Sequence, residues 1–280
     1  MIEIKEITTI DKKSIALMDT SSVSFMQNLK ANGINADDVL KDYDLILIPE
    51  WVLREIEDSP GRIQYVQNMI DEGYPIYAIA EETYSRLTDY EEGNLYRIVF
   101  ESVSMIGSMR SYLRRNVERD DPLEMEEYAA WINKLYDEWP ISSEETLSNG
   151  RRKKKNAGER SITILAEIFT WYYPEIQTVT VYSQDSDAFN CYKQAEEKLR
   201  KLFSSRTPMP VSFKSNDAIL CQLFRKGKID ADRIVLLRKD MRRITYSKQK
   251  QDHSSFLQTI VADNDKFLEL IKDDSVRIIF

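Results

Sequence analysis

The chain has 280 residues and a formal net charge of −8, with 42% hydrophobic and 31% charged residues, a balance typical of globular proteins. No apolar run approaches the roughly 18 residues of a membrane span, and the N-terminus lacks the apolar segment of a signal peptide. We therefore expect a cytoplasmic protein without membrane contact, and the acidic balance disfavours a generic basic coat for nucleic acid.

Apolar runs typical of strands alternate with helical patterns in the first part of the chain. Residues 14–19 (SIALMD) and 43–49 (YDLILIP) each predict a strand followed by a helix. Residues 74–80 (YPIYAIA) predict a third strand. From about 88 to 150 the pattern becomes helical and rich in charge, which we interpret as a helical insertion.

The alternation resumes after the insertion. A helix is predicted over 160–169, a strand over 177–183 with a helix after it, then a short strand (MPVSF) and a helix closed by Gly227. The segment SVRIIF predicts a late strand in a C-terminal extension of about 235–280. The whole pattern predicts an α/β fold with a central, mostly parallel sheet and helices on both faces.

Two residue types that often carry chemistry are scarce. The two cysteines, Cys191 and Cys221, are too few for a disulfide framework or a zinc ribbon, and they suit a reducing compartment. The single histidine, His253, lies in a polar segment and is interpreted as a solvated surface residue. Catalysis by several histidines is therefore excluded, and the chemistry must come from carboxylates, lysine, serine or tyrosine.

Acidic residues fall at the ends of predicted strands and at the starts of predicted helices. Asp19 ends the first strand, and Asp185 and Asp187 follow a later one. Glu55 lies one turn into the helix after the second strand, and Glu159 begins the helix after the insertion. Because sites in open parallel sheets form outside the carboxyl ends of the strands, we expect these carboxylates to converge.

Converging carboxylates repel one another, and a bound cation removes that cost. Without cysteine or histidine ligands, oxygen ligation favours Mg²⁺ or Mn²⁺, as one ion or two. Each acid also has a structural interpretation. Asp19 or Asp185 could be a helix N-cap. Glu159 and Asp187 could be first-turn acids that favour the helix dipole, and Glu55 a solvated helix residue.

Four ordered motifs, IALMDTSSV, LILIPEWVLREI, NAGERSITILA and VTVYSQDSDAF, resemble the PIN-domain nucleases over roughly residues 14–86 and 151–230. The segment SNDAILCQLFRKGKI is similar to that family's last helix. Glu50 is the alternative to Glu55 if the second helix is set differently. The positions that match the family's motifs are Asp19, then Pro49, Val52 and Glu55, then Gly158 and Glu159, and finally Ser183, Asp185 and Asp187.

The resemblance implies a PIN-like three-layer α/β/α domain over residues 1–280 that cleaves RNA or structured DNA with a divalent metal. Asp19 and Asp185 would be the principal ligands, and Glu159 and Asp187 would complete the site. Glu55 would bind the metal or support a ligand. Ser183 or Thr20 could orient a ligand or a phosphate. Many family members are toxins paired with an antitoxin.

Five consecutive basic residues precede this predicted site and contrast with the acidic chain. They would draw the phosphate backbone toward Glu159 in a salt-dependent manner, without reading sequence. Arg160 could face the scissile phosphate. The other interpretation is a charged loop that keeps the insertion in solution. The five residues are Arg151, Arg152, Lys153, Lys154 and Lys155.

The insertion carries apolar anchors that either pack on the body of the protein or form a surface for an inhibitor or for self-association. They are Met125, Tyr128, Trp131, Ile132, Leu135 and Trp139.

The sequence therefore predicts a Mg²⁺- or Mn²⁺-dependent endoribonuclease, with toxin, phage-defence and RNA-processing roles open. A catalytically inactive PIN-like module that binds nucleic acid or protein is the alternative. A phosphatase with Asp19 as nucleophile is disfavoured, because Ser21 stands where a second acid is usual. Nucleotide hydrolysis is disfavoured because the chain has no glycine-rich phosphate loop.

Overall fold

A computed structural model describes most of the chain. The described residues are 2, 4–5, 10–117, 127–138, 144–146, 152–154, 157–238, 241–249 and 254–280. At residues 4–5, 136–138, 144–146 and 152–154 the description covers the backbone alone.

Among the described residues, six parallel strands form the central sheet in the order β1-β4-β3-β2-β7-β8. β2 lies between β3 and β7, so that Ala16 is paired with both Ile46 and Thr180. Most strand residues are buried apolar side chains, as expected for a sheet covered on both faces. The strands are β1 (Ile4–Lys5), β2 (Ser14–Met18), β3 (Leu45–Pro49), β4 (Ile76–Ile79), β7 (Thr178–Tyr182) and β8 (Val211–Lys214).

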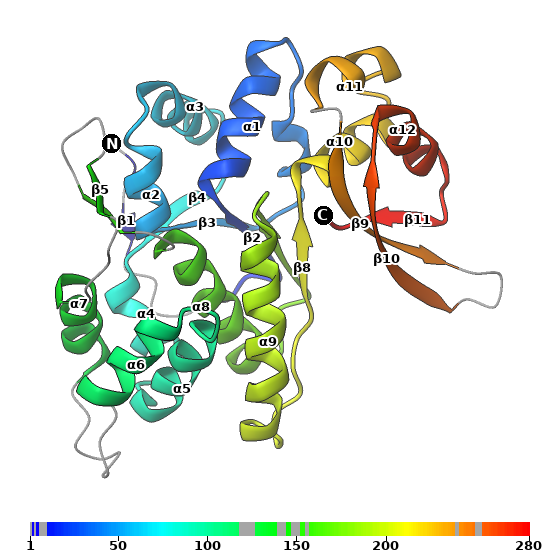
Figure 1. Ribbon diagram of the computed structural model, residues 1–280. Helices are drawn as coiled ribbons and strands as arrows, with labels where there is room; N and C mark the ends of the chain where they lie inside the picture. The colour runs from blue at the N-terminus through cyan, green and yellow to red at the C-terminus, as the bar shows by residue number, and fades with distance from the viewer. Residues whose placement is uncertain are drawn as a thin grey trace.

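Helices cover both faces of this sheet, with α1 and α3 on one side and α8 and α9 on the other (Figure 1). The predicted three-layer α/β/α class is confirmed, and the described ladders of the central sheet are all parallel. The helices of this part are α1 (Thr20–Ala31), α2 (Glu50–Ile56), α3 (Pro60–Asp71), α4 (Tyr84–Leu87), α8 (Ala157–Tyr172) and α9 (Ser186–Leu202), with the short 3₁₀ turns η1 (Asp37–Val39) and η2 (Glu81–Thr83).

The direction of strand addition reverses at β2. β3 and β4 are added on one side of β2, whereas β7 and β8 are added on the other. Such a switch point places a crevice at the carboxyl ends of the strands. There the chain leaves β2 at Asp19, whose backbone N–H donates to the carbonyl of Tyr182, the last residue of β7, at 3.0 Å.

The predicted helical insertion is helical in its first part only. Helices α5 (Glu92–Ser102), α6 (Gly107–Asn116) and α7 (Tyr128–Glu138) are followed by an antiparallel hairpin of β5 (Glu144–Thr146) and β6 (Arg152–Lys154). Within the predicted insertion of about 88–150, β5 is therefore the described departure from the helical pattern, and its partner β6 lies just beyond that range.

The apolar anchors on α7 face the body of the protein. Tyr128, Trp131, Ile132 and Leu135 are all buried, and the Tyr128 ring lies edge-on to Trp131 with centroids 4.9 Å apart. These four side chains therefore pack internally and offer no surface to a partner. The other two predicted anchors, at positions 125 and 139, lie outside the described residues.

The C-terminal extension adds a second sheet to the last helices. β9, β10 and β11 form an antiparallel sheet in the order β10-β9-β11, and the predicted late strand is β11. Phe280 ties the end of the chain to the central sheet, because its ring lies 6.0 Å from that of Phe213 in β8. The elements are α10 (Asn216–Arg225), α11 (Ala231–Leu237), β9 (Arg242–Gln249), β10 (Ser255–Ala262), α12 (Asn264–Lys272) and β11 (Val276–Ile278).

No described helix combines the length and the apolar character that crossing a bilayer requires.

Candidate active site

Asp19 is held rigidly at the switch point of the sheet. It caps helix α1, and its side chain is buried, with the residue 7% exposed. Oδ1 accepts from the backbone N–H of Thr20 at 2.8 Å, and Oδ2 accepts from the hydroxyls of Ser21 at 2.6 Å and Ser183 at 3.0 Å. Burial raises the pKa of Asp19 and the nearby Asp185 adds to this, while the three hydrogen bonds oppose it. The residue is thus both an N-cap and a fixed carboxylate at the sheet edge.

Asp185 and Glu159 bring two further carboxylates to the same place. Asp185 caps α9, with its Oδ1 accepting from the backbone N–H of Asp187 at 2.7 Å. Burial raises the pKa of Glu159 to about 8, helped by a hydrogen bond with Asp185 and by the charges of Asp185, Asp19 and Asp187. Three of the predicted acids therefore act electrostatically on Glu159, as expected for side chains gathered at one edge.

Ser183 connects two of these acids. Its hydroxyl donates to Oδ2 of Asp19 at 3.0 Å and accepts from the backbone N–H of Asp185 at 3.0 Å. The predicted orienting role therefore has a geometric basis, since one hydroxyl fixes the spacing between the turn after β7 and the end of β2.

Glu55 joins the group through helices α1 and α8. Its Oε2 accepts from the Thr20 hydroxyl at 3.0 Å, and its Oε1 lies beside Gly158 at the start of α8, where a Cβ would be only 3.2 Å from Cγ2 of Val52 in α2. The start of α8 therefore approaches α2 closely because residue 158 has no side chain. The alternative residue, Glu50, instead pairs with Arg54 one turn further along α2, at 2.5 Å. Glu55 is the glutamate of α2 that reaches this edge.

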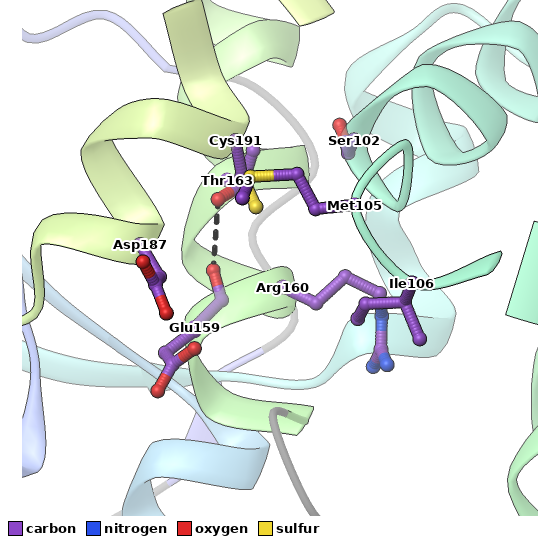
Figure 2. A pocket seen from close by; sticks show the side chains of 8 residues that line it. All are labelled: Ser102, Met105, Ile106, Glu159, Arg160, Thr163, Asp187 and Cys191. Atoms are coloured by element: carbon purple, nitrogen blue, oxygen red, sulfur yellow. Dashed lines mark hydrogen bonds between the residues drawn. The ribbon is translucent and has the colours of Figure 1, made fainter. Parts of the chain in front are cut away.

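Arg160 does not face the acidic group. Its side chain is buried, with Nη2 3.9 Å from Oε1 of Glu81 and Nη1 3.6 Å from the sulfur of Met109. Figure 2 shows its guanidinium turned away from Glu159 and Asp187. The predicted contact with a scissile phosphate is therefore wrong. A buried guanidinium needs a carboxylate partner, and Glu81 serves as that partner.

The basic block lies only a few residues before Glu159 in the sequence, which limits its distance from this edge of the sheet. Strand β6 contains its three central residues, while Arg151 and Lys155 lie outside the described residues. Lys154 is paired in register with Glu144 across the hairpin. Because an extended chain spans at most about 3.6 Å per residue, the Cα of Lys154 lies within about 18 Å of that of Glu159. The phosphate-binding role of the block stays a prediction.

Sequence reasoning missed two contributions to the site. Ser21 donates to Asp19 and accepts from the backbone N–H of Gln184 at 3.0 Å, so it ties the end of β2 to the turn after β7. The sequence feature that could have identified Ser21 is a hydroxyl residue two positions after an aspartate that ends a strand. The insertion also supplies Met105 and Ile106 to a cavity beside Glu159, for which the sequence carries no signal.

No protein-family model, no curated protein and no solved structure matches this chain. The similarity to PIN-domain nucleases therefore stays a prediction, and the function is argued from the site.

The donor set fits Mg²⁺ or Mn²⁺ in type and in charge. The acids offer oxygen ligands. Burial is the main reason that the pKa of Glu159 is raised, and the neighbouring carboxylates add repulsion that a cation would relieve. Burial and the nearby carboxylates raise the pKa of the Cys191 thiol to about 11, so this sulfur stays protonated at neutral pH and is a poor ligand. In the part of the chain that the structure describes, no group of three or more His, Cys, Asp or Glu side chains is already arranged to hold a metal ion. Ligation would therefore require Glu159 and Asp185 to give up their mutual hydrogen bond.

Proposed function

We propose that the protein is a Mg²⁺- or Mn²⁺-dependent nuclease that hydrolyses phosphodiester bonds inside RNA strands. The observation that carries this proposal is geometric: the Ser183 hydroxyl links Asp19 to the backbone of Asp185, and Glu159 and Asp187 line one cavity at the same edge. Acids drawn from three distant segments meet at a topological switch point, which is the usual position for a site in such a sheet.

In this proposal Asp19 and Asp185 are the principal ligands, and Glu159 and Asp187 complete the set. When bound, the divalent ion supplies an activated water and stabilises the leaving oxygen of a phosphodiester. Ser183 keeps Asp19 and the start of α9 at a fixed spacing through its two hydrogen bonds. Asp19 is held so firmly that little reorganisation of its side chain is needed on binding.

The proposed substrate is a polyanion. The distribution of charge along the chain supports attraction of this substrate at one place, near Glu159, rather than over the whole protein surface. The basic residues of β6 precede Glu159 by only a few positions, whereas the protein as a whole carries a net charge of −8. The preference for RNA and the role as a toxin or defence nuclease rest on the similarity to PIN-domain proteins. An inhibitor protein would be the corresponding partner.

One observation favours the alternative, an inactive module that binds nucleic acid or protein. Among the described residues, the acids are not already arranged as a ligand cage. Metal binding separates the two proposals, because a nuclease must bind Mn²⁺ at this group and an inactive module need not. Titration calorimetry with the wild-type protein and the Asp185→Asn variant measures this directly.

The deciding experiment incubates the purified protein with labelled tRNA, single-stranded RNA and flapped DNA, in Mn²⁺ or in EDTA. We expect internal cleavage of RNA in Mn²⁺ and none in EDTA. Cleavage that persists in EDTA would remove the metal from the proposal. Absence of cleavage for all three substrates, together with no Mn²⁺ binding, would leave the inactive module.

A further inference from the structure

A cavity of about 130 Å³ lies directly beside the acidic group. Figure 2 shows the cavity bounded by three elements, which are the end of helix α5 with the turn after it, the start of α8, and the first turns of α9. Glu159 and Asp187 form one wall, and Met105, Ile106 and Cys191 contribute apolar atoms to it. The cavity is thus shared between the elements of the sheet edge and the insertion that the sequence places at about 88–150.

We propose that this cavity holds a single-ring base of the RNA strand next to the scissile phosphate, so that the insertion gives the enzyme a preference for pyrimidines. This inference rests on the proposed nuclease function and specifies its substrate.

Charge decides which part of a nucleotide can enter. Glu159 and Asp187 line one wall of the cavity and, in the proposed function, hold the metal, so the scissile phosphate would lie at that wall. Arg160 also lines it, but its guanidinium lies beside Glu81, with 3.9 Å between Nη2 and Oε1. The remaining space, beside Met105, Ile106 and Cys191, carries no free charge among the described residues and suits the uncharged base of the same nucleotide.

Size decides between the two kinds of base. A cavity of roughly 150 Å³ encloses one benzene molecule in a protein core. The present cavity, at about 130 Å³ and partly open to solvent, accordingly accommodates one six-membered ring, whereas part of a bicyclic purine would remain outside its walls.

The lining offers both stacking and hydrogen bonding to such a ring. The sulfur atoms of Met105 and Cys191 suit contact with an aromatic ring. The Met105 side chain is 48% exposed, so it can adjust to a bound base. Ser102 also lines the cavity, and its buried hydroxyl has no hydrogen-bond partner among the described residues. A hydroxyl can donate to or accept from the edge of a base, which would satisfy this group.

The first test compares cleavage of oligoribonucleotides that differ at one position beside the cleaved bond, carrying uracil, adenine or no base. The wild-type protein should cleave the uracil substrate about 10-fold faster than the other two, within the range typical of a pocket that discriminates by size. Cys191→Met adds bulk inside the cavity and should abolish this preference. Glu197→Met places the same side chain at an exposed position of α9, outside the cavity, and should retain the preference.

The second test does not depend on cleavage. An oligoribonucleotide with one 4-thiouridine at that position is irradiated with the Asp19→Asn variant, which keeps the strand intact, and the crosslinked peptide is identified by mass spectrometry. We expect crosslinks to Met105 or Cys191, and their loss when Cys191→Met is added.

The outcomes separate the two proposals. If the wild-type protein cleaves all three oligoribonucleotides at equal rates and crosslinks elsewhere, the base pocket is overturned and the nuclease stands. If it cleaves no nucleic acid and forms no crosslink, both proposals fall together.

Discussion

The hydroxyl of Thr20 donates to Oε2 of Glu55 at 3.0 Å, although the two residues are 35 positions apart in the chain. The backbone N–H of Thr20 also donates to Oδ1 of Asp19. Thr20 is therefore a positioning residue that links the aspartate of the first strand to the glutamate of α2.

Removing this hydroxyl should impair catalysis without unfolding the protein. Thr20→Val keeps the shape of the side chain but cannot donate to Glu55, and we expect a loss of about 10- to 100-fold in kcat, as for other residues that support a ligand. Thr20→Ser retains the hydroxyl and should stay near the wild-type rate. Equal kcat values for Thr20→Val and the wild type would show that the hydrogen bond to Glu55 has no role in positioning.

Asp19→Asn should remove cleavage while leaving the fold intact. The amide lacks the charge that a metal ligand supplies, so we expect a loss beyond about 100-fold, the upper range for residues that only support a ligand. The melting temperature should be retained, because burial already disfavours the charged form of Asp19.

Asp44→Asn is the matched control for that substitution. Asp44 accepts from the backbone N–H groups of Lys13 and Ser14 at the opposite end of β2, at 3.2 and 3.1 Å. The variant changes the net charge by the same amount and should cleave normally. Loss of activity in both variants would point to charge or stability rather than to a ligand.

The basic block should control the salt dependence of RNA binding. Lys153→Gln combined with Lys154→Gln should lower the slope of log K against log salt by about 0.7 for each phosphate that the variant no longer neutralises, the value for single strands. Filter binding across a range of salt concentrations measures the slope. Lys201→Gln with Lys226→Gln removes two exposed charges near the far ends of α9 and α10, and this pair should leave the slope unchanged.

Glu167 should make the folded protein less stable as pH rises. Burial raises the pKa of Glu167 well above its ordinary value of 4.5; Glu196 adds to this and Lys193 opposes it. One oxygen accepts from Trp171 Nε1 at 2.9 Å, while Oε1 has no partner among the described residues. Above pH 4.5 the unfolded chain releases this proton and the native state keeps it, so the free energy of unfolding falls with pH until the folded pKa is reached.

Glu167→Gln imitates the protonated acid and should remove this slope. Relative to the wild type, the variant should gain up to about 1.4 kcal/mol of stability per pH unit above about 4.5. Urea denaturation at pH 5 and pH 8 measures the difference. Glu197→Gln, an exposed position on α9, should show no such trend. A stability difference between Glu167→Gln and the wild type that is the same at both pH values would contradict a proton held by Glu167.

Asp217 should anchor the C-terminal extension. Its carboxylate accepts from Arg238 Nε at 3.1 Å and from Arg242 Nη1 at 2.9 Å, and both Asp217 and Arg238 are buried. Asp217→Ala deprives a buried guanidinium of its carboxylate, which typically costs about 3–5 kcal/mol. Glu269→Ala breaks an exposed pair with Lys266 in the same extension and should cost less than about 1 kcal/mol in the same denaturation assay.

Much of the fold followed from local patterns in the sequence. The buried runs of β2, β3 and β7 are continuous apolar segments, which a sheet covered on both faces requires. Asp19 follows its run directly and Asp185 lies three residues after Tyr182, so their place at the carboxyl edge could be predicted. The N-cap interpretation was also correct for both, because a cap residue and a residue at the sheet edge occupy the same place after a parallel strand.

The partner of Arg160, unlike its direction, depended on three-dimensional packing. Neighbouring residues of a helix point roughly 100° apart, so Arg160 could not share the direction of Glu159. The pairing of Arg160 with Glu81 depended on how η2 packs against α8. The same holds for the cavity, whose wall at Met105 and Ile106 comes from the insertion.

The sequence by itself determined which residues end strands and begin helices, because hydrophobic period and capping are local properties. Only the tertiary structure decided which of them meet. The pairing of Thr20 with Glu55, the bridge from Ser183 to Asp19 and the partner of Arg160 each join segments far apart in the chain. Such contacts depend on strand order and on helix packing, which no local pattern of residues specifies.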